Sequence, residues 1–100
     1  MSYQVRFASA AADDLQRLFE FLTDQDLDAA ERAREAIGQA INMLQNFPFS
    51  CRKAAPDNPF LRELVISFGN AGYVALFEVE NANTVTILAV RHQREDDFHR

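Results

Sequence analysis

The chain has 100 residues, of which 48% are hydrophobic and 25% charged, the proportions of one globular domain rather than of a disordered segment. Its single cysteine, Cys51, excludes an intrachain disulfide, and its first residues lack the basic and apolar runs of a secretory signal. The formal net charge of −5 disfavours a protein that holds nucleic acid through phosphate contacts, which normally needs a basic surface. We therefore expect one cytoplasmic domain with no membrane segment and no direct nucleic-acid binding.

The negative charge is concentrated in one part of the chain. Residues 13–35 contain eight acidic and three basic residues, a difference of −5, so the rest of the sequence is neutral overall. Lys53 is the only lysine beside nine arginines. A local arginine cluster remains possible in this sequence, but the field of the whole protein does not favour an anionic partner.

The N-terminal part begins with a short strand and a helix. Residues 3–7 alternate between apolar and polar side chains, which predicts a strand. Ser9 is a suitable N-cap for a helix that we expect to end near Asp24. Its apolar stripe has the helical spacing i, i+3, i+4 and i+7 and consists of Leu15, Leu18, Phe19 and Leu22.

A second helix is expected to follow directly. Asp28 with Glu31 three residues later forms the pattern of a capping box, which predicts the start of this helix. It should end before Pro48, because the residue preceding a proline avoids the helical region. The short link over residues 25–27 predicts that the two helices form an antiparallel hairpin.

The C-terminal half is typical of antiparallel strands. Residues 48–59 contain all three prolines and are expected to form a loop with a functional role. Three strands are predicted at residues 60–68, 73–80 and 84–91, separated by turns rich in Gly and Asn. The sequence therefore predicts a single α+β domain over residues 1–100: a short N-terminal strand, an antiparallel helix hairpin, and a three-stranded antiparallel meander with the hairpin on one face.

Motifs of the common catalytic sites are absent from the sequence. It has no Gly-rich phosphate loop and no CxxC or HExxH pattern. Two histidines and one cysteine cannot supply the four nitrogen and sulfur ligands of a structural zinc site. We therefore expect no metal, no cofactor and no assigned catalytic residue.

The most informative residues are cationic and lie in or beside the predicted strands. They are Arg52, Lys53, Arg62, Arg91, His92 and Arg94. Alternation places Arg62 on the apolar face of its strand, where it either reaches solvent at the strand end or pairs with an acid such as Glu78. The Arg91–His92 pair is either a solvated strand end or a contact site. His92 is a possible proton shuttle, although a histidine alone more often packs or caps.

The order of these elements and three short motifs give the sequence a resemblance to a known family. The segments FPFSCRKA, FLRELVISFGNAGYVALFEVE and TVTILAVRHQRED resemble the ParE branch of the ParE/RelE toxin superfamily over the whole chain. The resemblance implies the toxin of a type II toxin–antitoxin system, of the kind also called plasmid stabilisation proteins, with a ParD-like antitoxin as its partner. ParE-like members are associated with inhibition of DNA gyrase, whereas RelE-like members cut mRNA in the ribosome.

Several positions distinguish these two branches. RelE-like toxins carry an arginine directly after the Gly-Tyr of the central strand, where this chain has Val74. They also use several lysines and a C-terminal tyrosine, whereas here Lys53 is alone and the tail offers Phe98. A non-enzymatic inhibitor that binds gyrase is therefore the favoured interpretation. A ribosome-dependent mRNA endonuclease that uses Arg62 and Arg94 and a non-toxic corepressor with the toxin fold are the alternatives.

The resemblance also implies contact surfaces. A gyrase inhibitor needs exposed aromatic and arginine anchors, and the candidate target contacts are Arg52, Lys53, Arg62, Arg91, His92, Arg94 and Phe98. An antitoxin helix would suit an apolar groove lined by Leu15, Leu18 and Leu22, giving a hetero-oligomer of toxin and antitoxin. An added antitoxin strand would need a free sheet edge, which either 3–7 or 60–68 could provide.

Overall fold

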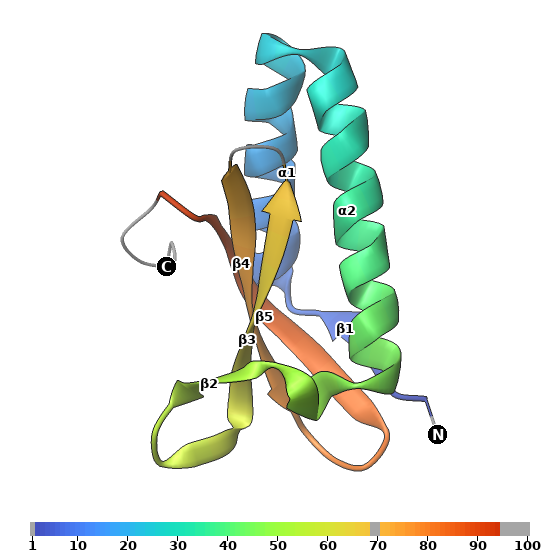
Figure 1. The fold of residues 1–100 in the computed structure, drawn as a ribbon, viewed down its shortest axis with the longest axis vertical. Helices are drawn as coiled ribbons and strands as arrows, with labels where there is room; N and C mark the ends of the chain where they lie inside the picture. Colours follow the sequence, from blue (N-terminus) through green and yellow to red (C-terminus); the bar gives the residue numbers. More distant parts are fainter. Residues whose placement is uncertain (1, 69–70, 95–100) are drawn as a thin grey trace.

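The computed structural model describes residues 2–68 and 71–94 (Figure 1) and consists of a helix hairpin that covers one face of a twisted β-sheet. This arrangement confirms the predicted α+β fold class. The elements in chain order are β1 (Gln4–Phe7), α1 (Ser9–Gln25), α2 (Leu27–Asn46), the 3₁₀ turn η1 (Pro48–Ser50), β2 (Arg52–Ala55), β3 (Asn58–Phe68), β4 (Ala71–Val79) and β5 (Thr84–His92).

The sheet is larger than the predicted three-stranded meander. Its strand order is β1-β5-β4-β3-β2, in which β1 runs parallel to β5 and the other neighbours are antiparallel. The expected loop over 48–59 contains η1 and β2, so the prediction of a continuous loop there is wrong. β2 pairs through its backbone with the start of β3 (Arg52 opposite Glu63, Lys53 opposite Arg62), and its residues do not alternate between apolar and polar. A strand of this kind leaves no periodic signal in the sequence.

Both helix starts differ from the predicted ones. The N-cap of α1 is Ala8 rather than Ser9, and no side chain caps this helix. Helix α2 begins at Leu27, and the carboxylate of Asp26 accepts a hydrogen bond from the N–H of Asp28 at 2.9 Å. The capping box predicted at Asp28 is therefore wrong, because Asp26 caps the helix and is also the single residue between the two helices.

The hydrophobic core lies between the hairpin and one face of the sheet. α1 packs mainly on β5, and α2 packs on β3. The most buried large side chains are Tyr73, Phe77, Leu44, Val74, Val85 and Pro48. Leu18 of the predicted stripe in the first helix belongs to this core, and Leu15, Phe19 and Leu22 pack against it. In the second helix, Ala33, Ile37 and Leu44 belong to the core at helical spacing. The hydrophobic periodicity of the two helices therefore gave their orientation correctly.

The edges of the sheet are β1 and β2. Of the two segments predicted as free edges, residues 3–7 do lie at an edge, as strand β1. The segment 60–68 is only partly free, because β2 pairs with the first part of β3 as far as Glu63. Within the described chain, residues 64–68 of β3 have no strand partner on the side away from β4. In the part of the chain that the structure describes, neither helix is long and apolar enough to cross a membrane.

Candidate functional site

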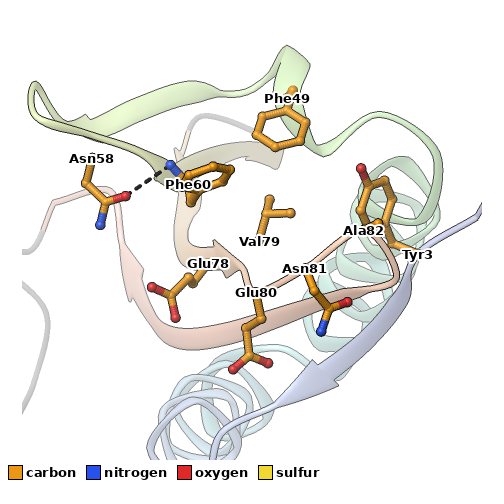
Figure 2. Close-up of a pocket in the computed structure, with 9 residues that line it drawn as sticks. All are labelled: Tyr3, Phe49, Asn58, Phe60, Glu78, Val79, Glu80, Asn81 and Ala82. Atoms are coloured by element: carbon orange, nitrogen blue, oxygen red, sulfur yellow. Dashed lines mark hydrogen bonds between the residues drawn. The ribbon is translucent and has the colours of Figure 1, made fainter.

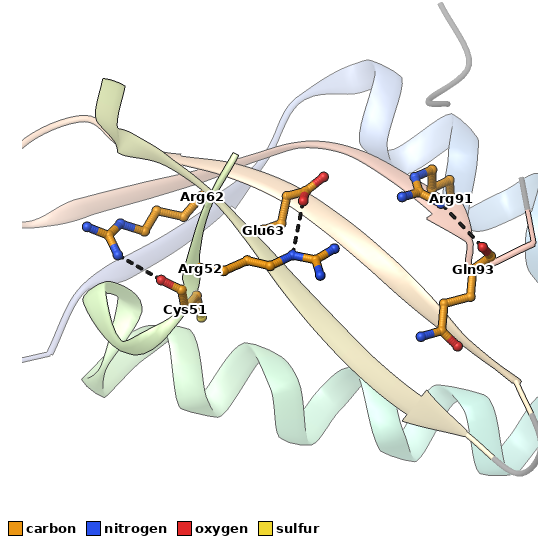
Figure 3. Close-up of polar contacts among 6 residues, drawn as sticks. All are labelled: Cys51, Arg52, Arg62, Glu63, Arg91 and Gln93. Carbon is orange, nitrogen blue, oxygen red and sulfur yellow. Dashed lines mark hydrogen bonds and ion pairs between the residues drawn. The ribbon is translucent and has the colours of Figure 1, made fainter. Parts of the chain in front are cut away.

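The candidate target contacts fall into two groups at different ends of the sheet. Figure 3 shows Arg62 and Arg52 near one end and Arg91 near the other. The pairing along β4 explains the separation: Arg62 lies opposite Phe77, whereas His92 lies opposite Tyr73, four residues further along the strand. At about 3.3 Å per residue the two groups are more than 10 Å apart. They cannot form one compact site.

Arg62 belongs to the first group and is bound to the backbone of its own loop. Its guanidinium donates to the carbonyl of Pro59 at 2.7 Å, to that of Cys51 at 2.7 Å and to that of Phe49 at 3.2 Å. Its Cζ also lies over the ring of Phe49, 5.2 Å from the ring centroid, which is within the ~6 Å typical of a cation–π contact. The carbonyls of Phe49, Cys51 and Pro59 therefore engage this half-buried guanidinium, and no ion pair joins it to Glu78 among the described residues.

The other members of the first group are exposed. Arg52 forms an ion pair with Glu63 across the β2–β3 pair at 3.1 Å, and Lys53 beside it is exposed. Cys51 is buried next to them, and burial raises the pKa of its thiol, an effect that the nearby Arg62 partly offsets. The thiol is therefore protonated at neutral pH and is a poor nucleophile.

The second group lies at the end of β5. The ring of His92 meets the buried ring of Tyr73 edge to face, with centroids 5.8 Å apart. The backbone N–H of Arg94 donates to Nδ1 of His92 at 3.1 Å, which fixes the orientation of the imidazole. Burial raises the pKa of Tyr73, so this hydroxyl stays protonated at neutral pH. His92 and Arg94 are thus held close together by the turn that follows the strand.

An open hollow of about 420 Å³ joins this second group to helix α1. It is lined by Arg17, Leu18, Phe21, His92 and Arg94. Phe21 is 63% exposed, and the side chain of Arg17 is 39% exposed. We call these five residues the cationic hollow. It contains the arginine and aromatic side chains that most often anchor protein–protein contacts.

Sequence reasoning missed two members of the cationic hollow. Arg17 and Phe21 are four residues apart on α1 and therefore lie one turn apart on the same helix face. This face is beside the apolar stripe, not on it. An exposed phenylalanine outside the stripe was the available signal.

The predicted antitoxin groove is largely filled by the protein's own core. Leu15 and Leu22 are partly buried against the core cluster, and Leu15 lines an internal cavity of only about 10 Å³. Leu18 is 7% exposed and also lines the cationic hollow. Of the three predicted groove residues, Leu18 is the one that lines the cationic hollow. Of the remaining candidates, Arg91 is half-buried on β5 and donates weakly to the carbonyls of His92 and Gln93, and Phe98 lies outside the described residues.

The candidate positions supply guanidinium, ammonium, imidazole and aromatic side chains. No three His, Cys, Asp or Glu side chains of residues 2–68 and 71–94 are grouped so that they could hold a metal ion. The helix hairpin, the mixed sheet and the cationic hollow together describe a small α+β protein that has basic and aromatic side chains at one hollow and a net charge of −5.

Comparison with known proteins identifies the family. Residues 5–97 match the family model described as the ParE toxin of the type II toxin–antitoxin system parDE. The chain belongs to this family and is a ParE-type toxin of a type II toxin–antitoxin system.

A solved structure has the same fold. It is described as the chromosomal ParDE TA system from P. aeruginosa and superposes with a TM-score of 0.68 at 17% sequence identity, covering 91% of this chain and 96% of that chain. No curated protein matches the chain by sequence. The shared elements extend over nearly the whole of both chains, so the helix hairpin and the sheet are common to the two proteins.

Proposed function

We propose that this ParE-type toxin acts in the cytoplasm by binding and inhibiting DNA gyrase, and that a ParD-like antitoxin neutralises it. The observation that carries the proposal is the cationic hollow, where the exposed ring of Phe21 lies with Arg17 and Arg94. Aromatic and arginine side chains beside each other are the usual anchors of protein interfaces. The candidate contacts Arg91 and Phe98 come from the same end of the chain.

The state of Arg62 supports a binding function over the mRNA endonuclease. A ribonuclease needs cations that can reach the RNA backbone and stabilise the charged transition state. Arg62 is instead engaged with three backbone carbonyls. Val74, at the position where RelE-like toxins carry arginine, is 2% exposed. The positions expected of a nuclease are thus occupied by a bound guanidinium and a core side chain.

A supercoiling assay tests the proposal directly. Purified toxin should inhibit supercoiling by gyrase at micromolar concentration and should leave ribosome-bound mRNA intact. Phe21→Ala and Arg94→Ala should weaken the inhibition by about tenfold or more, the effect of losing an interface anchor. Leu27→Ala, which removes an equally exposed apolar side chain at the tip of the hairpin, is the matched control.

Two results would contradict the gyrase proposal. Cleavage of mRNA without any effect on supercoiling would favour the endonuclease. Unimpaired growth of cells in which the isolated gene is induced would favour a toxin-fold corepressor without toxicity. In that case the protein would serve mainly to bind its antitoxin.

The sheet edges and the acidic helices support an antitoxin partner. Among the described residues, the outer side of β1 and residues 64–68 of β3 have no strand partner, so an added strand would find backbone groups to pair with there. The acidic segment 13–35 complements a basic antitoxin. Co-expression with a ParD-like protein should restore growth, and hydrogen exchange should show new protection along one of these two edges. Light scattering of the purified complex would give the stoichiometry of the hetero-oligomer, whereas protection confined to the cationic hollow would contradict strand addition.

A further inference from the structure

A second hollow lies at the opposite end of the sheet from the cationic hollow. Strands β3 and β4 are paired from Leu61 opposite Glu78 onward, so they separate beyond this point. The gap opens into a cavity of about 540 Å³ (Figure 2). It is lined by Tyr3, Phe49, Asn58, Phe60, Glu78, Val79, Glu80, Asn81 and Ala82. None of the described residues that line it is basic.

Three aromatic rings form the apolar walls. The rings of Phe49 and Phe60 meet edge to face with centroids 6.1 Å apart, and the ring of Tyr3 lies across the cavity in Figure 2. Phe49 and Phe60 are 44% and 51% exposed, which leaves much of their apolar surface open to water. Such an exposed aromatic pair at a concave site marks a surface that is covered on binding.

The walls are held in place by the local backbone. Tyr3 N–H donates to the carbonyl of Gln45 at 2.6 Å, which ties the N-terminal segment to the end of α2. The N–H of Phe60 donates to the side chain of Asn58 at 3.1 Å. The guanidinium of Arg62 stacks on the ring of Phe49 and donates a hydrogen bond to the carbonyl of the same residue. The cavity is therefore preformed, so that a ligand loses little affinity to reorganisation.

Two carboxylates supply negative charge along the side formed by β4. Glu80 accepts a hydrogen bond from the hydroxyl of Thr86, which orients it. Glu78 is half-buried, and it makes no hydrogen bond or ion pair with any residue that the structure describes. A half-buried carboxylate without a partner beside aromatic rings attracts a cation that can use both.

We propose that this aromatic–acidic hollow binds the side chain of an arginine in a partner protein. A planar guanidinium stacks on aromatic rings and forms a two-point contact with a carboxylate, whereas its aliphatic stem covers apolar surface. The net charge of −5 favours a basic partner for the whole molecule. Phe47, two residues before Phe49 in the sequence, is also 66% exposed. The site differs from the cationic hollow and does not depend on gyrase as the target.

Titration of the ¹⁵N-labelled full chain with the blocked tripeptide Ac-Leu-Arg-Leu-NH₂ tests the proposal. The largest changes of amide chemical shift should be those of Phe60, Val79 and Glu80. The same tripeptide with citrulline in place of arginine keeps the shape but removes the charge, and it should bind at least about tenfold more weakly. Glu78→Gln and Phe60→Ala should each weaken binding of the arginine peptide by about as much as citrulline does. Glu31→Gln, an exposed acid on α2, is the control and should leave binding unchanged.

Four outcomes would overturn the proposal. Equal binding of the citrulline peptide would show that charge is not recognised, and undiminished binding to Glu78→Gln would remove the carboxylate from the site. Shift changes centred on α1 and α2 would place the cation on the acidic helices instead. Blocked arginine alone binding as tightly as the tripeptide would assign the hollow to a small guanidinium ligand. Because Glu78 and Phe60 lie at a solvent-exposed cavity, both variants should fold, and their amide spectra would verify it.

Discussion

The carboxylate of Asp14 accepts a hydrogen bond from the backbone N–H of Val90 at 2.9 Å, across 76 residues of sequence. Asp14 is 5% exposed and is the one buried charged residue of the described chain. Strand β5 extends beyond the last residue that β1 pairs with, Ile87, so its backbone would otherwise have an unsatisfied donor inside the core. A helix side chain thus completes the hydrogen bonding of a strand.

Loss of this contact should destabilise the fold. We expect Asp14→Ala to lower the free energy of unfolding by about 1–3 kcal/mol, because it leaves the N–H of Val90 buried and unpaired. Asp14→Asn should recover part of the loss, since an amide oxygen still accepts. Urea denaturation followed by circular dichroism measures both variants. Asp13→Ala, its exposed neighbour, should change stability by less than about 0.5 kcal/mol, and an equal loss in that variant would contradict the explanation.

Arg62 should prove to be a structural residue. Arg62→Ala removes three hydrogen bonds to carbonyls and should cost about 2–3 kcal/mol, with the fastest amide exchange appearing at Ser50 and Cys51. Arg62→Lys should rescue little, because an ammonium lacks the planar set of donors. Arg52→Ala, which breaks only the exposed pair with Glu63, is the matched control and should cost less than about 1 kcal/mol. Unchanged stability of Arg62→Ala together with lost toxicity would indicate a functional arginine instead.

The two glycines Gly38 and Gly72 should respond to alanine with opposite signs. A Cβ at Gly72 would lie 2.4 Å from the backbone oxygen of Ile66, so the β3–β4 pair would have to shift. Gly38 lies within α2 with nothing inside 4 Å of the added carbon. We expect Gly72→Ala to destabilise by more than about 1 kcal/mol and Gly38→Ala to stabilise by about 0.5–1 kcal/mol. Thermal unfolding measures both variants, and a change of the melting temperature in the same direction for both would contradict this prediction.

Stability should fall at alkaline pH because of Cys51. Burial raises the pKa of this thiol above its ordinary value of 9.0, so the folded state holds the proton more tightly than the unfolded state does. Its contribution is complete below the ordinary value and is lost as the pH rises through 9.0 toward the raised value. Urea denaturation at several pH values between about pH 7 and pH 10 measures how steeply the free energy of unfolding falls with pH. In Cys51→Ala the free energy of unfolding should fall less steeply with pH near pH 9. The raised pKa of Tyr73 should still lower the free energy of unfolding as the pH rises past 10.

The thiol should also react slowly with a disulfide reagent in the folded protein. Complete and fast labelling at neutral pH in the absence of denaturant would contradict the burial of Cys51. Labelling in urea is the control, since unfolding exposes the same thiol.

The two helices and the three long strands could be predicted because their apolar residues repeat with a clear period. The helix hairpin could be predicted from the short link between Gln25 and Leu27, and the meander from the turns that follow β3 and β4. The strand β2 could not be found in this way, because Arg52 and Lys53 pair through backbone groups that any residue carries. The true N-cap Asp26 was missed because Asp28 offered an equally suitable side chain two residues later.

The candidate sites were harder to predict than the fold. Periodicity put Arg62 on the apolar face correctly, but its partners are carbonyls of residues 49, 51 and 59, which sequence does not mark. Arg17 and Phe21 join Arg94 only because α1 packs on β5. Both hollows combine segments distant along the chain, so neither could be read from any one motif. Single residues were identified, whereas their grouping required the structure.

The parallel pairing of β1 with β5 sets the order in which the molecule can be built during synthesis. The ribosome releases β1 and α1 first, but β1 finds its neighbour, and Asp14 its donor, only when the last strand emerges. Long-range pairing of this kind closes late in folding. The complete five-stranded sheet therefore cannot form until β5, the last strand of the chain, has been synthesised.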